Sequence, residues 1–102
     1  MTPFKHISVA NAQNLTSADN VIFVDIRDRV SFSHGHIENA LFLDNTNIDE
    51  FIATTDKKTT VVVYCYHGNS SQNAAQFIAS QGFATVYSMD GGFEQWAASQ
   101  TA

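Results

Sequence analysis

Residues 61–77 of the chain, "VVVYCYHGNSSQNAAQF", contain its only cysteine. Four apolar residues, from Val61 to Tyr64, lead directly into Cys65, and a helical pattern begins about five residues later. An apolar, β-branched run that ends at a glycine-containing loop is typical of a strand buried on both faces. The stretch therefore predicts a buried strand, a loop that begins at Cys65, and a helix.

The alternation of strand and helix patterns continues along the rest of the chain. The segment "VIFVDI", residues 21–26, is almost wholly apolar and predicts a second strand buried on both faces. Shorter strand patterns occupy residues 4–9, 40–43 and 85–89, and helical patterns occupy residues 10–19, 45–54 and 93–100. Strands that alternate with helices favour an α/β fold in which helices cover a parallel sheet.

The helix after the cysteine loop carries two expectations of its own. Ser70 or Ser71 is placed to cap its first turn. Ala74, Phe77 and Ile78 follow at helical spacing and share one apolar face. We therefore expect that face to pack against the sheet.

Size and composition limit the classes of protein that the chain can represent. With 102 residues, 44% of them hydrophobic, we expect one domain over residues 1–102. The formal net charge is −5 and the five lysines and arginines are scattered, so nothing indicates binding to nucleic acid or to an anionic membrane. The longest apolar run is too short to cross a bilayer, and the first 15 residues lack the apolar core of a signal peptide. A lone cysteine forms no internal disulfide, and we expect a cytoplasmic protein.

The loop "CYHGNSS", residues 65–71, contains no lysine or arginine, yet it is suited to hold a sulfur anion. The first N–H groups of a helix lack intrahelical partners, and Gly68 lets the backbone curl so that such groups point inward. A ring of N–H groups at a helix N-terminus binds anions and lowers the pKa of a thiol inside it. The same ring would stabilise a persulfide on Cys65 or receive an oxyanionic donor. The alternative is that Cys65 is an inert core residue at the end of a strand.

Four motifs, taken together, resemble the signatures of the rhodanese family. They are "VDIRD" at residues 24–28, "FSHGHIENA" at 32–40, "VVVYCYHGNSS" at 61–71 and "DGGFEQW" at 90–96. Their order and spacing match over nearly the whole chain, from about Phe4 to Trp96, and the similarity is greatest to the single-domain thiosulfate sulfurtransferases. The resemblance implies an α/β fold with a five-stranded parallel sheet flanked by helices on both faces.

For Cys65, the resemblance implies a nucleophile that transfers sulfur in two steps. Its thiolate attacks the outer sulfur of thiosulfate, releases sulfite and becomes a persulfide, and an acceptor then removes that sulfur. Cyanide or a thiol would act as acceptor, a thioredoxin-like dithiol protein is the partner that the family suggests, and no metal or organic cofactor is expected. The resemblance also implies that backbone N–H groups of the loop bind the persulfide: those of Tyr66, His67, Gly68, Asn69 and Ser70.

Two other functions stay open at this point. Phosphatases and arsenate reductases form a sister group with the same fold, but their loop is one residue longer and places an arginine six positions after the cysteine to hold the oxyanion. Ser71 occupies that position here, which disfavours them. A sulfur-carrier module loaded by a partner protein would hold the same persulfide in the same loop, so the sequence does not distinguish a carrier from an enzyme.

Residues outside the loop are expected to support it. Asp25 and Arg27 match the D-x-R motif of the family, and we expect an ion pair that fixes the loops at the mouth of the site, with contact between Arg27 and substrate as the alternative. His36 is expected to order its own loop by hydrogen bonding. Ser71 either caps its helix or donates a hydrogen bond to the persulfide. The segment of residues 90–96 is expected to be structural, with a tight turn at its glycines.

The remaining histidines give a weaker alternative. His34, His36 and His67 could form a zinc site with Cys65, but their spacing lacks the paired pattern of metal-binding modules. His67 could act as a general base, although a thiolate that the backbone already stabilises needs none. We expect His67 to point outward and to affect access to the cysteine.

Overall fold

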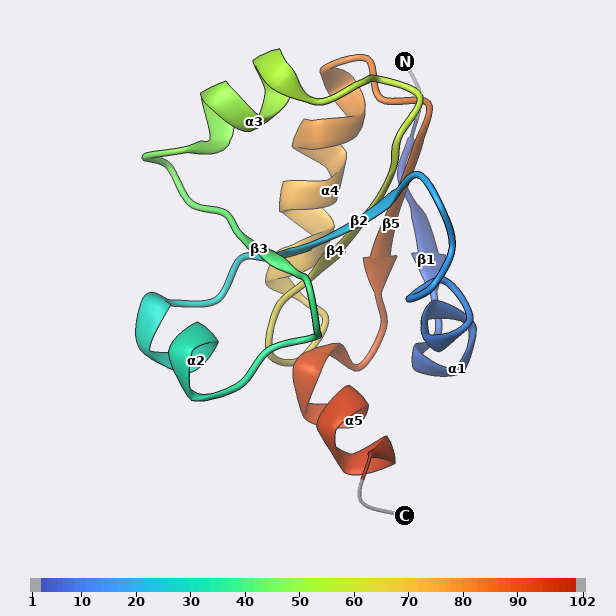
Figure 1. Ribbon diagram of the computed structural model, residues 1–102, viewed down its shortest axis with the longest axis vertical. Coiled ribbons are helices and arrows are strands. Elements are labelled where there is room, and N and C mark those ends of the chain that lie inside the picture. Colours follow the sequence, from blue (N-terminus) through green and yellow to red (C-terminus); the bar gives the residue numbers. More distant parts are fainter. Residues whose placement is uncertain (1–2, 101–102) are drawn as a thin grey trace.

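The computed structural model describes residues 3–100, which form a five-stranded and wholly parallel sheet (Figure 1). The strands lie in the order β1-β5-β4-β2-β3, so β4 occupies the centre and the short strands β1 and β3 form the edges. Their bounds are Lys5–Ile7 for β1, Val21–Asp25 for β2, Leu41–Phe42 for β3, Thr60–Tyr64 for β4 and Thr85–Met89 for β5. The predicted α/β fold with a five-stranded parallel sheet is confirmed.

Helices connect the strands and cover both faces of the sheet. Their bounds within residues 3–100 are Val9–Gln13 for α1, Arg29–His34 for α2, Ile48–Thr54 for α3, Ser70–Ser80 for α4 and Gly92–Ser99 for α5. One apolar cluster fills the space between the sheet and helices α1 and α5, and a second fills the space between the sheet and helices α3 and α4. In the described part of the chain, no helix has the length and apolar character needed to cross a membrane.

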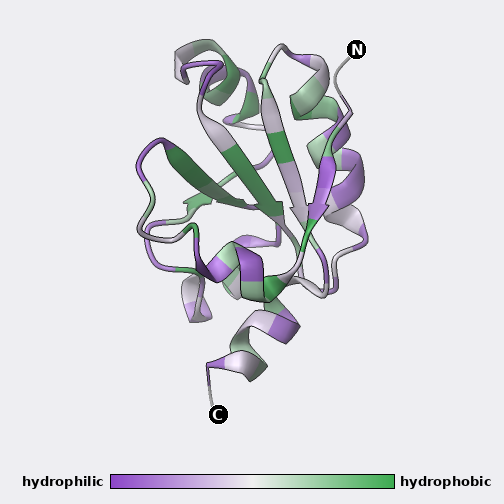
Figure 2. Ribbon diagram, turned by 90° about the vertical axis from the view of Figure 1, so that its right-hand side faces the viewer, coloured by the Kyte–Doolittle hydropathy of each residue, from purple (hydrophilic) through white to green (hydrophobic). Residues whose placement is uncertain are grey.

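After its first residue, Thr60, the central strand β4 is apolar and buried, because both of its faces are covered (Figure 2). Side chains of a strand point alternately to its two faces. Val61 and Val63 therefore join the cluster under α4, whereas Val62 and Tyr64 join the cluster under α1 and α5. All four residues are fully buried, which explains why this strand shows no alternation of polar and apolar residues.

The expectation that Phe77 packs against the sheet is wrong. The structure leaves 45% of its surface exposed, and the buried face of α4 consists of Ser71, Ala75, Ile78 and Ala79. Successive residues of an α-helix are rotated by about 100°, so Phe77 lies about 200° around the helix from Ala75. The small residues at 75 and 79 let α4 approach the sheet closely, and the large side chain at 77 is turned away from it.

We predict unequal costs for two substitutions in α4. Ile78→Ala is expected to lower the free energy of unfolding by about 2–5 kcal/mol, because it opens a cavity in a fully buried position. Phe77→Ala is expected to lower it by no more than about 0.5 kcal/mol, as at most surface positions. Urea denaturation of the two variants measures both values. Equal losses would mean that α4 is rotated relative to this structure.

Candidate active site

Cys65 directly follows the last residue of the central strand. It therefore belongs to the loop that joins β4 to α4, whose course Figure 1 shows. Because all strands are parallel, their carboxyl ends meet at one edge of the sheet, where the pairing of β2 with β4 aligns Asp25 with Tyr64. Open α/β sheets bind their ligands beyond this edge. The position of Cys65 is therefore one at which a reactive group is accessible to a ligand.

Backbone N–H groups point at the sulfur of Cys65. The N–H of Gly68 donates to Sγ over 3.1 Å, and that of Ser71 donates to Sγ over 3.3 Å. Gly68 has a φ of +94°, a left-handed conformation that glycine adopts without steric cost. Ser71 is the second residue of α4, so its N–H has no partner within the helix. The sulfur thus accepts two hydrogen bonds from neutral backbone groups.

Next to the sulfur, the hydroxyl groups of Ser71 and Ser88 form a buried pair. Their oxygen atoms are 2.8 Å apart, and both residues are fully buried. A hydroxyl has one proton to donate. If Ser88, on β5, donates its proton to Ser71, the hydroxyl of Ser71 is free to donate toward the sulfur of Cys65.

These groups together lower the pKa of the Cys65 thiol. Burial acts in the opposite direction, since only 5% of the residue is exposed and a thiolate there loses hydration. Hydrogen bonds from the side chain and the N–H of Ser71, and from the N–H groups of Gly68 and His67, favour the thiolate and outweigh burial. Because the thiolate is the nucleophilic form of cysteine, the loop favours reactivity at a lower pH than that of an ordinary thiol.

An open cleft of about 390 Å³ leads from solvent to Cys65. Arg27, Asp28 and Tyr66 are among the residues that line it, and 49% of the tyrosine surface is exposed. Hydrogen bonds from Ser31 lower the pKa of Asp28, which is therefore a carboxylate at neutral pH. The cleft thus brings groups of both charges close to the sulfur.

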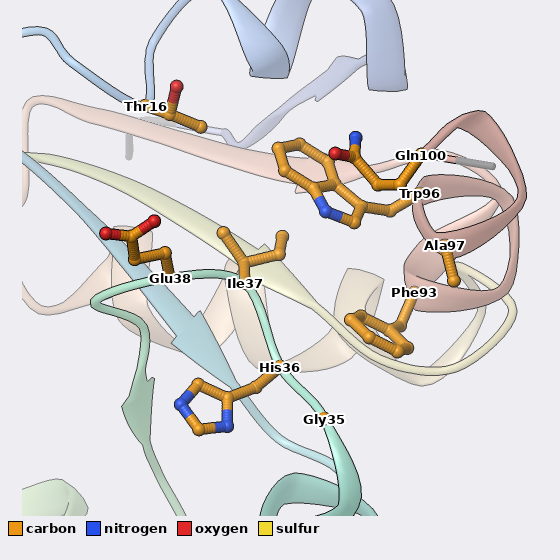
Figure 3. Close-up of a pocket in the computed structure, with 9 residues that line it drawn as sticks. All are labelled: Thr16, Gly35, His36, Ile37, Glu38, Phe93, Trp96, Ala97 and Gln100. Carbon is orange, nitrogen blue, oxygen red and sulfur yellow. The ribbon is translucent and has the colours of Figure 1, made fainter. Parts of the chain in front are cut away.

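A larger cavity, of about 480 Å³, lies against α5 (Figure 3). Its walls include Phe93 and Trp96 from α5, and His36 and Ile37 from the segment after α2. Cys65 does not line this cavity. We therefore assign the candidate site to the smaller cleft, where the groups that act on the sulfur converge.

Asp25 and Arg27 form a buried ion pair beside the cleft. Nη2 of Arg27 donates to Oδ2 of Asp25 over 2.6 Å, and Nε lies 3.1 Å from both carboxylate oxygens. Nη2 also donates to the carbonyl of Gly35 over 2.6 Å, and the guanidinium carbon lies 4.1 Å from the ring centre of Phe93. These contacts join the end of β2 to the segment after α2 and to α5. They also offset most of the positive charge that Arg27 brings to the cleft.

The histidines have separate places in the structure. His36 is ordered by its own segment, since its Nδ1 lies 2.7 Å from the carbonyl of Phe32 and the two rings stack 3.8 Å apart. His67 is exposed, with Nδ1 3.1 Å from Oε1 of Glu94. Within residues 3–100, no group of three or more histidine, cysteine or acidic side chains is arranged to hold a metal ion.

The other residues of the predicted loop surround the opening at Cys65. Tyr66 and Ser70 line the main cleft, and Asn69 lines a smaller adjoining hollow. Of the N–H groups that donate to Sγ at the distances given above, that of Gly68 belongs to the predicted loop and that of Ser71 lies one residue beyond it. The N–H of His67, also in the predicted loop, contributes to the lowered pKa of Cys65.

The prediction that Ser70 or Ser71 caps α4 is wrong. Asn69 is the residue that precedes the helix, and its side chain makes no capping hydrogen bond. The hydroxyl of Ser71 is instead paired with Ser88. The first N–H groups of α4 are therefore not capped by these serines, and one of them is directed at the cysteine.

Two contributions from the β5–α5 region were missed by the sequence analysis. The N–H of Phe93 donates to the carbonyl of Cys65 over 2.8 Å, and the N–H of Glu94 donates to the carbonyl of Tyr66 over 3.0 Å. Ser88 supplies the buried hydroxyl described above. The available signal for Ser88 was a serine inside an otherwise buried strand pattern. The contacts of the Phe93 and Glu94 N–H groups could not be found in this way, because they do not depend on the type of side chain.

We predict that Ser88→Ala raises the pKa of Cys65, because it removes the group that orients the Ser71 hydroxyl. The pH dependence of alkylation by iodoacetamide measures this pKa. The wild-type midpoint is expected below about 8.5, the ordinary thiol value, and the midpoint of Ser88→Ala closer to it.

Two further variants control this measurement. Ser71→Ala combined with Ser88→Ala should shift the midpoint no further than Ser71→Ala alone, since Ser88 acts through Ser71. Ser80→Ala, which removes an exposed hydroxyl at the other end of α4, should leave it unchanged. An unchanged midpoint in Ser88→Ala would show that the hydroxyl pair does not act on the sulfur.

Known proteins resemble the chain over nearly its whole length. A family model described as the rhodanese-like domain matches residues 8–99. The thiosulfate sulfurtransferase GlpE of Shewanella oneidensis is 52% identical over 96 residues, which are 94% of this chain and 95% of that protein. The protein of the same name from Ectopseudomonas mendocina is 51% identical over 98 residues, which are 96% of this chain and 89% of that protein.

Solved structures share the fold as well. A rhodanese-related protein from Thermoplasma volcanium superposes with a TM-score of 0.80 at 23% identity, over 94% of this chain and 93% of that one. At that level of identity the superposition demonstrates a common fold only. The family is shown by the sequence matches. Those matches cover the cysteine loop and the strands and helices that hold it, and the chain therefore belongs to the family of rhodanese-like domains.

Proposed function

We propose that the protein is a thiosulfate sulfurtransferase that acts through a persulfide on Cys65. The observation that carries this proposal is the pair of hydrogen bonds from the N–H groups of Gly68 and Ser71 to the cysteine sulfur, which favour its nucleophilic form. The names of relatives about half identical to this chain supply the donor, thiosulfate. The hydrogen bonds to the sulfur and the names of the relatives both support a reaction in which the Cys65 thiolate displaces a group from sulfur.

The proposed reaction consists of two displacements. In the first, the Cys65 thiolate attacks the outer sulfur of thiosulfate, a new S–S bond forms at Sγ, and sulfite leaves with the electron pair of the broken S–S bond. In the second, cyanide or an acceptor thiolate attacks the terminal sulfur, and the electron pair of the Sγ–S bond returns to Cys65. The products are sulfite and either thiocyanate or a persulfide of the acceptor, and no outside oxidant or reductant enters the balance.

The loop is proposed to hold the terminal sulfur of the persulfide by its backbone. That sulfur carries a negative charge and extends from Sγ toward the opening, which Tyr66, Asn69 and Ser70 line. The N–H groups of these residues, with those of His67 and Gly68, are the proposed donors. The N-terminus of α4 adds the favourable end of a helix dipole.

Charges around the cleft indicate that thiosulfate itself is bound weakly. Asp25 offsets the charge of Arg27, and the carboxylate of Asp28 lines the same cleft. We therefore propose that Asp25, Arg27 and His36 keep the shape of the site and that N–H groups, rather than a cationic side chain, attract the donor. A less charged sulfane donor would fit such a cleft at least as well.

The acceptor is proposed to be a small thiol or a dithiol protein of the thioredoxin type. The cleft is open and Tyr66 is exposed at its rim, so a protein thiol can approach the terminal sulfur. A sulfur carrier loaded by a partner remains the second candidate, because it would use the same open loop. The number of sulfur atoms transferred per protein molecule distinguishes an enzyme from a carrier.

A phosphatase or arsenate reductase is not proposed. Those enzymes need an arginine at the position of Ser71, and a serine there has no positive charge to hold an oxyanion. Hydrolysis of a phosphate ester at a rate comparable to sulfur transfer would reverse this choice.

The compartment is proposed to be the cytoplasm. The chain has one cysteine, and a free thiolate persists where thiols are kept reduced. A dithiol acceptor of the proposed type is regenerated under the same conditions. Fractionation of cells that produce the protein tests this placement.

We predict that incubation with thiosulfate adds one sulfur atom to the protein. Intact-protein mass spectrometry should detect the added mass, and cyanide or a dithiol should remove it. Cys65→Ser should gain nothing, since no thiolate is present to attack the donor. A wild-type protein that gains no sulfur would contradict thiosulfate as donor, and a Cys65→Ser protein that gains one would contradict Cys65 as the acceptor atom.

We also predict repeated turnover with a small dithiol as acceptor. Sulfite release should continue well beyond one equivalent per protein, because the second displacement regenerates the thiolate. Release that stops at one equivalent while the dithiol stays in excess would favour the sulfur carrier. Ser80→Ala should turn over as the wild type does, since its exposed hydroxyl lies far from the loop along α4.

A further inference from the structure

The loop of Cys65 packs directly, backbone against backbone, on Gly91 and on Gly92, the first residue of α5. A Cβ atom at Gly92 would lie 2.4 Å from the carbonyl oxygen of Tyr66 and 2.6 Å from that of Cys65. A Cβ atom at Gly68 would lie 2.8 Å from the backbone nitrogen of Gly91. Contacts this short are absent between real Cβ atoms and backbone, so glycine at these positions is what permits the close approach.

The close approach makes two hydrogen bonds possible. In the first turn of α5, the N–H groups of Phe93 and Glu94 donate to the carbonyls of Cys65 and Tyr66, over 2.8 Å and 3.0 Å. The first N–H groups of a helix have no partner within it. In this protein two carbonyls of the cysteine loop accept hydrogen bonds from two of these N–H groups. The contact therefore provides partners both for the start of α5 and for the loop.

These bonds fix the directions of the N–H groups in the loop. In a planar trans peptide, the C=O of one residue and the N–H of the next point to opposite sides. The carbonyl of Tyr66 points to α5, so the N–H of His67 points away from α5, and this N–H is one of the groups that lower the pKa of Cys65. The next N–H, that of Gly68, reaches Sγ directly.

We propose that Gly92 is a positioning residue for the nucleophile: its lack of a side chain lets the start of α5 hold the carbonyls of residues 65 and 66, and this contact keeps the loop in the conformation in which the N–H of Gly68 reaches the sulfur. Gly92 itself touches neither the sulfur nor a substrate. The consequence of Gly92 for sulfur transfer rests on the proposed function. The effect of Gly92 on the pKa of the Cys65 thiol does not.

The test compares Gly92→Ala with a matched variant, Gly82→Ala. Both glycines have positive φ angles, +61° at Gly92 and +102° at Gly82, so alanine meets left-handed backbone strain in both. At Gly82, the nearest atom to an added Cβ is Cδ of Lys57 at 4.0 Å, which is an ordinary contact. Only the change at Gly92 forces the loop and α5 apart.

The pH dependence of Cys65 alkylation by iodoacetamide is the readout. In Gly92→Ala the midpoint should rise toward that of an ordinary thiol. The alkylation rate at neutral pH should then fall, by up to about tenfold for each unit by which the pKa exceeds the pH. In Gly82→Ala the midpoint should stay that of the wild type, although the protein is less stable. A wild-type midpoint in folded Gly92→Ala, or an equal rise in both variants, would overturn the proposal.

A second measurement applies to the wild-type protein and does not depend on the folding of a variant. The amide protons of Phe93 and Glu94 should be protected from hydrogen exchange, because they are bonded to the loop. Exchange at the rate of an open helix start would overturn the proposal. Neither readout uses a sulfur donor, so failure of this inference and failure of the sulfurtransferase assignment are separate results.

Discussion

The sulfur of Cys65 is held by hydrogen bonds from neutral groups, in a loop whose sequence from residue 65 to residue 71 contains no lysine or arginine. A nearly buried thiolate is costly unless donors replace the water that it loses. The N–H groups of Gly68 and Ser71 and the hydroxyl of Ser71 provide that replacement. The proposed chemistry depends on this constraint, because thiolate, persulfide and oxyanionic donor are all negative.

The fold has to orient backbone donors, because a peptide N–H cannot rotate toward a partner as a lysine side chain can. Three parts of the structure help to orient the N–H groups of the loop. The parallel sheet places the end of β4 next to the start of α4, the pair of Asp25 and Arg27 ties β2 to the segments around it, and the start of α5 holds two carbonyls of the loop. A cysteine loop of this kind therefore needs nearly the whole domain, in agreement with a family match over residues 8–99.

Much of this arrangement could be predicted from the sequence, and the remainder could not for physical reasons. The apolar run before Cys65 and the glycine after it are local signals, and they indicated both the buried strand and the anion-binding loop. Phe77 has the same hydrophobicity as a core residue, and only the close packing of α4 on the sheet shows that it faces outward. The contacts of Ser88 and of the α5 N–H groups join segments distant in sequence, and the N–H groups are present in every residue except proline. No pattern of side chains reveals the N–H contacts, whereas Ser88 left one signal, a serine inside a buried strand pattern.

The structure of the protein after reaction with thiosulfate would show which groups stabilise the persulfide. We expect a terminal sulfur on Cys65 within hydrogen-bonding distance of several loop N–H groups, with no cationic side chain at that distance. A terminal sulfur that instead lies against Arg27 or His67, with the loop N–H groups turned away, would contradict it. In that case a charged side chain, and not the backbone, would stabilise the anion.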